Sequence, residues 1–442
     1  MELARRLTRL ARLDRFPFHM PGHKNRFSQL VPKFDATELP GLDNLHNPQA
    51  AIMRAQARVA ETYGVARTFF LVNGSSVGLM AAIASVVGPG EKILVPRASH
   101  KSVVAGLIHS GAVPVWLEQD YCIPEQRWLP PTADQVAKLI AGHSLKGALF
   151  TNPDYFGFVP DIATLTRLCH SAGVAVIADE AHGAHLKFGG AVNLPVSAVD
   201  AACDIIVQSP HKTLPALTQA AWLHLNDGGL AAEIQHWLNL FHTTSPSYLL
   251  LASLEFAGEY ARNHAERLLK RLARLEKALS LQCRALNLQV FSGAAPRDWT
   301  KFTLPARLGM EKLLRRAGVY PELVQGNKVL LMLTLADAYD DAGIRALCRL
   351  LPRLAALSAV RRPPLAIPPL PVQEVSPREA WQRGGKRVGF RDARGRIARQ
   401  VIAPYPPGTL VIVPGQRLTG EHVDFLEELH ARKVISRWIE VI

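Results

Sequence analysis

The chain has 442 residues, 48% of them hydrophobic, with 31 glycines and 31 prolines. This length exceeds what one small core needs and predicts two domains, or one large domain with appendages, in a globular α/β protein. The formal net charge is +14, but basic and acidic residues are interspersed in presumed surface helices such as 261–279. Because no nucleic-acid-binding motif is found either, we expect a solvated basic surface and no nucleic-acid partner.

Apolar runs and cysteines exclude two further classes of protein. No apolar run approaches the roughly 18 residues of a membrane span, so no membrane partner is expected. The cysteines lack any CxxC spacing, which predicts neither a zinc site nor a disulfide framework; they are Cys122, Cys169, Cys203, Cys283 and Cys348. A reducing cytoplasm is the simplest compartment for such a chain.

The first predicted element is an N-terminal helix. Residues 1–15 are basic, and leucines at positions 3, 7, 10 and 13 recur at helical spacing. A transit peptide would also be basic. However, the segment runs directly into "FPFHMPGHK" (16–24), so we expect an ordinary first helix.

Strand-like and helix-like stretches alternate from about residue 65 to 225. Helical patterns, for example at 76–88 and 161–173, lie between several apolar strand candidates. These candidates are 91–97, 112–117, 146–152, 174–180 and 203–209. Such β-α-β alternation predicts a mostly parallel sheet covered by helices on both faces.

The rest of the chain predicts a smaller second part. A long helical stretch continues to about residue 280, and a more irregular α+β region follows it. The segment 360–377 is proline-rich and indicates a linker before a terminal unit containing 403–416. We therefore expect an N-terminal helix and arm at 1–40, a large domain at 41–285 and a C-terminal part at 286–442.

Residues 69–83 combine a strand, the sequence Gly74-Ser75-Ser76 and an apolar helix. Backbone N–H groups at a helix N-terminus, together with two hydroxyls, form a natural phosphate site. The serines would also serve as ordinary helix N-caps, so this motif alone leaves both interpretations open.

Asp179 and Lys212 each lie at the end of a predicted buried strand. Open α/β sheets bind ligands at this edge, although a structural salt bridge would equally satisfy a buried carboxylate at Asp179. A lysine that is partly desolvated has a lowered pKa and can form a Schiff base.

Polar side chains accompany these two residues. Ser209 and His211 stand beside Lys212, where they would hold an anion, and His100 follows the strand 91–97. A phosphate site, a carboxylate and a lysine in this order are what pyridoxal 5′-phosphate requires. The carboxylate would keep the pyridine nitrogen protonated, and the lysine would carry the aldehyde.

Eight motifs carry a family resemblance. They are "HMPGHK" (19–24), "DATELPGLDNLHNP" (35–48), "FFLVNGSS" (69–76), "RASHKS" (97–102), "DEAHGAH" (179–185), "QSPHKTLPALTQ" (208–219), "HTTSPSY" (242–248) and "YPPGTLVIVPGQ" (405–416). With them the chain resembles the Orn/Lys/Arg decarboxylase family, of the aspartate aminotransferase superfamily (fold type I), in its shorter form without an N-terminal wing domain. The resemblance implies a mostly parallel seven-stranded sheet flanked by helices, with a smaller α+β C-terminal domain.

The resemblance also implies site residues. Lys212 matches the lysine that binds the cofactor, Asp179 the partner of its pyridine nitrogen, and His100 the histidine on the cofactor face. His182 is implied to lie near the ring hydroxyl. Phosphate contacts are implied for Gly74, Ser75, Ser76, Ser209 and His211, and for Thr244 across a subunit interface.

The implied activity is decarboxylation of a basic amino acid to CO₂ and an amine that serves as a polyamine precursor. The implied assembly is a homodimer or higher homo-oligomer with the active site at its interface. Arginine or lysine is favoured over ornithine as the substrate. Another fold type I reaction (an aminotransferase or a lyase) and a non-catalytic regulatory homologue are the alternatives. Retention of Lys212, Asp179 and His100 argues against the last of these.

Three positions depart from the family pattern and concern the substrate. Gln400 and Gln416 stand where glutamate is usual, and Glu255 stands where aspartate is common. A buried cation on the substrate needs a nearby negative charge, which glutamine does not supply. Glu255 and Gln416 are therefore the candidate substrate contacts. Alternatively, the C-terminal glutamates of the family are structural and their replacement is neutral.

Overall fold

The computed structural model describes residues 1–13, 34–39, 41–288, 296–360, 367–404 and 409–442. The motif at 19–24 lies outside these ranges, as do the first four residues of the motif at 405–416.

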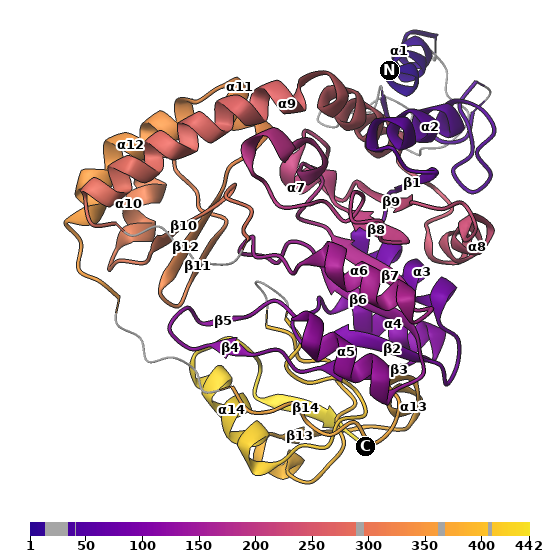
Figure 1. The fold of residues 1–442 in the computed structure, drawn as a ribbon, viewed down its shortest axis with the longest axis vertical. Coiled ribbons are helices and arrows are strands. Elements are labelled where there is room, and N and C mark those ends of the chain that lie inside the picture. The colour runs from indigo at the N-terminus through magenta and orange to yellow at the C-terminus, as the bar shows by residue number, and fades with distance from the viewer. Residues whose placement is uncertain (14–33, 40, 289–295, 361–366, 405–408) are drawn as a thin grey trace.

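A seven-stranded sheet of order β1-β9-β8-β7-β6-β2-β3 forms the core (Figure 1). Its strands are β1 (Arg67–Leu71), β2 (Lys92–Pro96), β3 (Val113–Leu117), β6 (Leu145–Thr151), β7 (Ala175–Glu180), β8 (Ile205–Gln208) and β9 (Ala221–Leu225). Strands β3, β2, β6, β7 and β8 pair in parallel, whereas β9 is antiparallel to both β1 and β8. The predicted mostly parallel sheet is confirmed, and the five predicted strands form with their ends shifted by no more than two residues.

Helices cover both faces of this sheet. One face carries α3 (Ser75–Val86), α4 (Ser102–Ser110) and α8 (Ala231–Phe241); the other carries α2 (Ala51–Tyr63), α5 (Ala133–Gly142), α6 (Ile162–Ser171) and α9 (Tyr248–Ala285). Side chains alternate along a strand, so Ile177 of β7 enters the apolar cluster under α3, while Val176 and Ala178 enter the cluster on the opposite face. The next side chain on the α3 side is that of Asp179.

Short elements complete this large part of the chain. They are β4 (Tyr121–Cys122), β5 (Arg127–Trp128), α7 (Pro210–Thr213) and two 3-10 turns at Leu186–Phe188 and Gly190–Val192. Among the described residues, none of the helices combines the length and the hydrophobicity that a bilayer crossing demands.

The chain after α9 forms two separate units (Figure 1). The first packs on α9 and contains β10 (Lys301–Pro305), β11 (Leu323–Gln325), β12 (Lys328–Met332), α10 (Met310–Arg316), α11 (Leu335–Tyr339) and α12 (Ala342–Ala355). The second has its own apolar core and contains α13 (Pro377–Gln382), β13 (Lys386–Gly389), a 3-10 turn (Arg391–Ala393), α14 (Gly420–Ala431) and β14 (Trp438–Val441). It docks through α13 against α4, at the opposite side of the large sheet.

The predicted N-terminal helix forms as α1 (Glu2–Leu13), and Leu3 and Leu7 enter the main core. Its first turn is held by Glu255 of α9, whose carboxylate accepts the N–H groups of Glu2 at 2.6 Å and Leu3 at 2.8 Å. Arg58 donates to the same carboxylate. Glu255 thus satisfies N–H groups that a helix start leaves without partners, and its charge complements the helix dipole.

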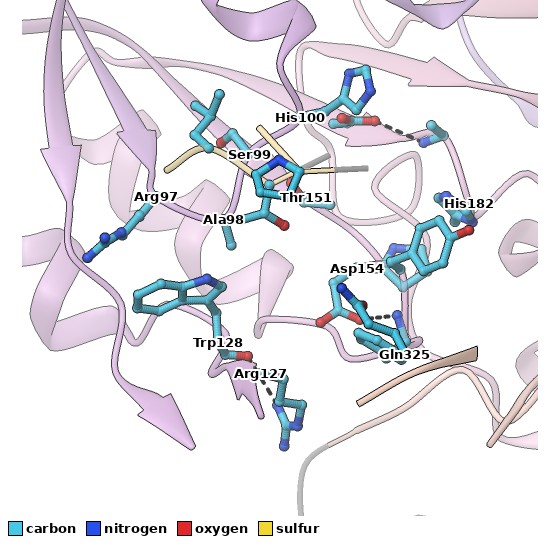
Figure 2. A pocket seen from close by; sticks show the side chains of 18 of the residues that line it. Arg97, Ala98, Ser99, His100, Arg127, Trp128, Thr151, Asp154, His182 and Gln325 are labelled. Carbon is cyan, nitrogen blue, oxygen red and sulfur yellow. Dashed lines mark hydrogen bonds between the residues drawn. The ribbon is translucent and has the colours of Figure 1, made fainter. Parts of the chain in front are cut away.

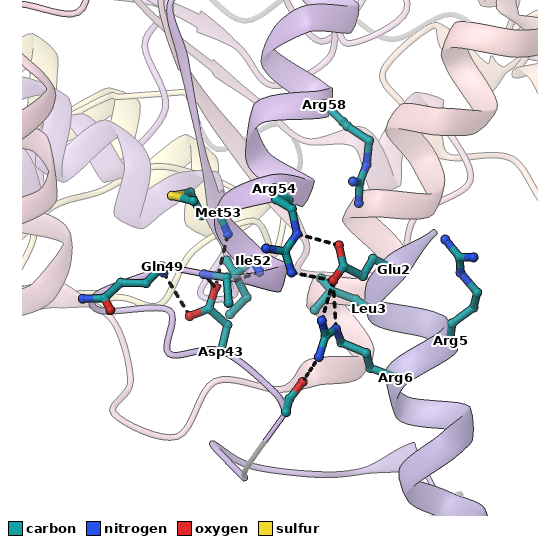
Figure 3. A network of polar contacts seen from close by, with 12 residues as sticks. Glu2, Leu3, Arg5, Arg6, Asp43, Gln49, Ile52, Met53, Arg54 and Arg58 are labelled. Carbon is teal, nitrogen blue, oxygen red and sulfur yellow. Dashed lines mark hydrogen bonds and ion pairs between the residues drawn. The ribbon is translucent and has the colours of Figure 1, made fainter.

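Glu2 joins α1 to α2 through Arg54 of α2, and it also pairs with Arg6 of its own helix (Figure 3). Arg54 and Arg6 lie 2.6 and 2.7 Å from its carboxylate. Hydrogen bonds from Arg54, and then from Arg6, outweigh burial and lower the pKa of Glu2 to about 2. The carboxylate of Glu2 therefore remains charged at physiological pH.

Asp43, from the motif at 35–48, accepts N–H groups at the start of α2, as Glu255 does at the start of α1 (Figure 3). Burial alone would raise the pKa of Asp43, but hydrogen bonds from backbone N–H groups outweigh burial and lower it. The N-cap residue Ala50 has no side-chain acceptor of its own. Asp43 replaces it by accepting the N–H groups of Asn44, Gln49, Ala50, Ile52 and Met53.

The Glu255→Gln substitution should lower the free energy of unfolding by about 1–3 kcal/mol, because hydrogen bonds to a buried charged acceptor are weakened. Denaturant unfolding followed by circular dichroism measures this change. The matched control is Glu259→Gln, one helical turn further on, where a carboxylate that is 47% exposed pairs with the N-terminal ammonium. The control should change stability by less than about 1 kcal/mol. Equal effects of the two substitutions would contradict the assigned role of Glu255.

Candidate active site

A cavity of about 1220 Å³ lies at the carboxyl ends of the parallel strands. Both C-terminal units contribute to its walls, through 322–328 in the first and 409–411 in the second. Nine of the residues predicted from sequence line it: Gly74, Ser75, Ser76, His100, Asp179, His182, Ser209, His211 and Lys212. Positions spread over 139 residues of sequence, from 74 to 212, therefore meet in one place.

One wall of the cavity is built around Arg97 (Figure 2). Its guanidinium lies over the ring of Trp128 at 4.7 Å and donates to the carbonyl oxygen of Pro368 at 2.8 Å. Burial lowers the pKa of Arg97 to about 10, against the opposing charge of Glu118. This contact joins the second C-terminal unit to the end of β2.

The start of α3 is open to an anion. Gly74 is the N-cap residue, with a φ of 81°, and no side chain caps the helix. Ser75 and Ser76 are the first two helical residues, so the alternative that either serine is the N-cap is wrong. In the same cavity, the buried hydroxyl of Ser209 has no hydrogen-bond partner among the described residues. Unpaired N–H groups and a free hydroxyl are what a phosphate group requires.

Asp179 and Glu180 are adjacent in sequence but take different roles. Glu180 points to the opposite face, where Asn152, Ser197, Gln208 and the backbone N–H of Ala198 surround its carboxylate. Burial raises the pKa of Glu180 to about 7, against those hydrogen bonds. Asp179 instead lines the cavity, where its carboxylate accepts the N–H of Ala181 at 3.2 Å.

Lys212 and His182 are in direct contact. The Nζ atom of Lys212 lies 3.1 Å from Nε2 of His182. Burial lowers the pKa of Lys212, against the opposing charges of Asp179 and Glu322. Burial, and then the charge of Lys212, hold the pKa of His182 well below its usual range. The imidazole is therefore neutral, and Lys212 is closer to its free amine form than an exposed lysine.

The two other predicted histidines are also buried beside the cavity. The Nδ1 atom of His100 lies 2.8 Å from the hydroxyl of Ser102, and that of His211 lies 2.8 Å from the carbonyl oxygen of Ala220. Burial lowers the pKa of both residues. His100 also forms a backbone bridge to Thr409, which brings the second C-terminal unit to the cavity.

Sequence reasoning missed Glu322 and Tyr155. Glu322 reaches the cavity from the first C-terminal unit, and the hydroxyl of Tyr155 donates to its carboxylate at 2.5 Å. The ring of Tyr155 packs edge-on against His182 at 5.1 Å. No local sequence pattern predicts a role for Glu322, because it lies in an irregular segment just before β11.

The structure corrects the substrate role expected for Glu255. Its carboxylate holds the start of α1, and it does not line the cavity. Gln416 is also absent from the lining: it is buried, and its Oε1 accepts the N–H of Val413 at 2.8 Å. Gln400 accepts the N–H of Glu440 at 3.1 Å. The two glutamines therefore support backbone in the second C-terminal unit, which agrees with the structural alternative.

Thr244 does not line the cavity either. It is exposed, and the N–H of its neighbour Thr243 donates to Asn73, the residue before Gly74. The loop is thus close to the start of α3, with Thr244 itself at the surface.

Comparisons with known proteins agree with this architecture. The pattern described as "Orn/Lys/Arg decarboxylase, major domain" matches residues 3–300, and "Orn/Lys/Arg decarboxylase, C-terminal domain" matches residues 365–435. An arginine decarboxylase of Bacillus subtilis is 32% identical over 442 residues, which cover 92% of this chain and 89% of that protein. The uncharacterized protein YaaO of the same organism is 35% identical, over 98% of this chain and 94% of its own length.

Solved structures show the same fold. A lysine decarboxylase of Francisella novicida superposes with a TM-score of 0.80 at 19% identity, covering 100% of this chain and 81% of that one. A serine palmitoyltransferase of Sphingomonas wittichii superposes with a TM-score of 0.59 at 13% identity, covering 79% and 83%. The expected fold class, fold type I, is confirmed. The matches over both parts of the sequence show that the chain belongs to the Orn/Lys/Arg decarboxylase family, a family of pyridoxal-phosphate-dependent amino-acid decarboxylases.

Proposed function

We propose that this enzyme decarboxylates arginine with pyridoxal 5′-phosphate as its cofactor. The observation that carries the proposal is a single cavity that combines an open helix N-terminus, a strand-end carboxylate and a desolvated lysine. Full-length relatives named arginine decarboxylase, at 31–33% identity, favour arginine over lysine and ornithine.

The residues present fit the cofactor. The N–H groups of Ser75 and Ser76, with Ser209 and His211, would hold its phosphate, since no other described residue pairs with the Ser209 hydroxyl. Asp179 would accept a hydrogen bond from the protonated pyridine nitrogen, and Lys212 would bind the aldehyde. When bound, pyridoxal phosphate supplies an electron sink for the pair of electrons that departing CO₂ leaves behind.

The side chains of the cavity would then divide the remaining tasks. Asp179, beside the ring nitrogen, would stabilise the positive charge on which that electron sink depends. His100 would contact the ring, and its burial keeps the imidazole neutral, so that it adds no charge there. Lys212 or His182 would return a proton to the carbon that loses CO₂.

Glu322 is the residue that we propose to bind the guanidinium group of the substrate. Its carboxylate lines the cavity and is near enough to Lys212 to raise the pKa of that lysine. The hydroxyl of Tyr155 holds one carboxylate oxygen. A planar guanidinium pairs with a carboxylate through two parallel hydrogen bonds, which favours arginine over a point charge on a shorter chain.

We also propose a homodimer in which Thr244 contacts the cofactor phosphate of the neighbouring subunit. Support comes from the exposed position of Thr244 beside Asn73 and the start of α3.

The Lys212→Ala variant should lose both the visible absorbance of bound cofactor and the release of CO₂ from arginine, because no other amine replaces it. Absorption spectroscopy measures the bound cofactor, and a CO₂ assay measures turnover of arginine. The control Lys187→Ala removes a lysine that pairs with Asp200 outside the cavity, and it should keep both signals. Keto-acid formation by the wild type in place of CO₂ would instead indicate an aminotransferase.

The Glu322→Gln variant should raise KM for arginine about 10- to 100-fold, with a smaller change in kcat, because a charge-assisted pair with the substrate is lost. Tyr155→Phe, which only frees the carboxylate from its hydroxyl partner, should raise KM about two- to fivefold. Steady-state kinetics on arginine, lysine and ornithine measure these changes. The control Glu311→Gln, on the outer face of α10, should match the wild type. An unchanged KM in Glu322→Gln would remove Glu322 from the substrate site.

The dimer proposal predicts complementation between two impaired variants. Thr244→Arg should weaken cofactor binding in the neighbouring subunit, and Lys212→Ala abolishes its own site. Mixed dimers of the two would contain one site with an intact Lys212 and an intact Thr244. Activity after mixing and subunit exchange should therefore exceed that of either variant alone. No recovery in mixed dimers shown to form by mass spectrometry would place Thr244 outside the neighbouring site.

A further inference from the structure

Lys301 is a fully buried lysine that none of the sequence motifs contains. It is the first residue of β10, in the first C-terminal unit, and its Nζ atom lies 3.3 Å from Nδ1 of His182. The other imidazole nitrogen, Nε2, lies 3.1 Å from Nζ of Lys212. His182 therefore stands between two amines, one at the cavity and one behind it.

The backbone around Lys301 leaves room for this approach. Gly157 has a φ of 93°, and a Cβ atom there would lie 2.6 Å from the carbonyl oxygen of Asp298 and 2.9 Å from Cγ of Lys301. Both distances are too short for a side chain, so any other residue at 157 would force a shift in the backbone at Asp298 or in the stem of Lys301. Close packing against Asp298 and Lys301 thus explains why residue 157 is a glycine.

Hydrogen-bond chemistry restricts where the protons can lie in the row formed by Lys301, His182 and Lys212. A neutral imidazole carries one N–H donor and one acceptor nitrogen, an ammonium only donates, and a free amine also accepts. His182 is neutral, because burial, and then the positive charge of a neighbouring lysine, opposes its protonation. It follows that the lysine facing the ring N–H is a free amine, while the other lysine donates to the second ring nitrogen as an ammonium or as an amine.

The surrounding charges favour the ammonium at Lys301. Burial lowers the pKa of Lys301 to about 8, against the opposing charge of Asp298, which is itself fully buried. His185 and Lys301 help to hold the pKa of Asp298 at about 2 against burial, so this carboxylate is always ionised. Further charges face the row from neighbouring elements: Asp154 and Glu322 near Lys301, Asp179 and Glu322 near Lys212, and His100 and His211 near His182.

We propose that Lys301 is a positioning residue that keeps Lys212 a free amine: its ammonium donates to Nδ1 of His182, which places the ring proton on Nε2, and Nε2–H donates to the Nζ lone pair of Lys212. The proposal rests on the role of Lys212 in binding the aldehyde, because only the free amine attacks a carbonyl carbon. Lys301 touches the reaction only through His182 and does not line the cavity.

The test uses three variants of the full chain. Lys301→Met removes the donor but keeps a long side chain, and Lys301→Arg restores a donor that is always charged. The control Lys328→Met removes another buried lysine of the same small sheet, whose Nζ donates to the carbonyl oxygen of Gln126. Two readouts are independent of turnover: ¹⁵N chemical shifts of His182, which identify its tautomer, and the pH dependence with which an amine-reactive reagent labels Lys212, measured by mass spectrometry.

The wild type and Lys301→Arg should show the Nε2–H tautomer of His182 and label Lys212 at a lower pH than ordinary lysines. In Lys301→Met the Nε2–H tautomer should no longer dominate, and the pKa of Lys212 should rise. A rise of about one in that pKa lowers the labelling rate below the pKa about tenfold. Formation of the cofactor's absorbance band should slow by the same factor, and its onset should move to higher pH.

Several results would overturn the proposal. They are an Nδ1–H tautomer in the wild type, an unchanged Lys212 in Lys301→Met, a failure of Lys301→Arg to restore the wild-type signals, or an equal effect of Lys328→Met. If Lys301→Met does not fold, the wild-type tautomer and Lys301→Arg still decide the matter. A protein that releases no CO₂ from arginine would refute the proposed function but leave these two readouts intact.

Discussion

The parallel pairing of β7 with β8 is the constraint on which the site depends. Its register sets Asp179 opposite Val207 and Glu180 opposite Gln208. Both strands therefore end at the same edge, and the turn after β8 brings Lys212 next to His182 in the turn after β7. A slip of one residue in β7 would exchange Asp179 for Glu180, and the cavity would lose its carboxylate to the network on the opposite face.

Burial determines the charge state of the site more than any single ion pair. It lowers the pKa values of Lys212, Lys301, His182, His100 and His211, because each charged form would lose its hydration. Neutral imidazoles and a free amine are the forms that accept protons and attack carbonyl carbons. Within the described part of the chain, the same burial leaves the hydroxyl of Ser209 without a partner, which is costly unless a ligand supplies one.

Both C-terminal units act on the site, from opposite sides. The first supplies Glu322 at the cavity and Lys301 behind His182, and the second closes the cavity with the segment 409–411. The contact of Arg97 with Pro368 and the packing of α13 on α4 fix the second unit in place. The glutamines that replace family glutamates lie inside that unit, where they serve backbone hydrogen bonds.

The sequence by itself determined the order of strands and helices along the chain, the mostly parallel sheet, and the residues at the ends of its strands. These features are local: apolar periodicity sets the elements, and the carboxyl ends of parallel strands always share an edge. The motifs at 69–76, 97–102, 179–185 and 208–219 therefore predicted nine residues that the structure brings together. Only the tertiary structure decided which carboxylate reaches the cavity from outside the sheet, and which lysine supports His182. Glu322 and Lys301 come from an irregular segment and an ordinary strand, whereas the carboxylate of Glu255, the candidate suggested by departures from the family pattern, binds the first turn of α1. Their positions depend on how the first C-terminal unit and α9 pack on the sheet, a long-range arrangement that no local pattern encodes.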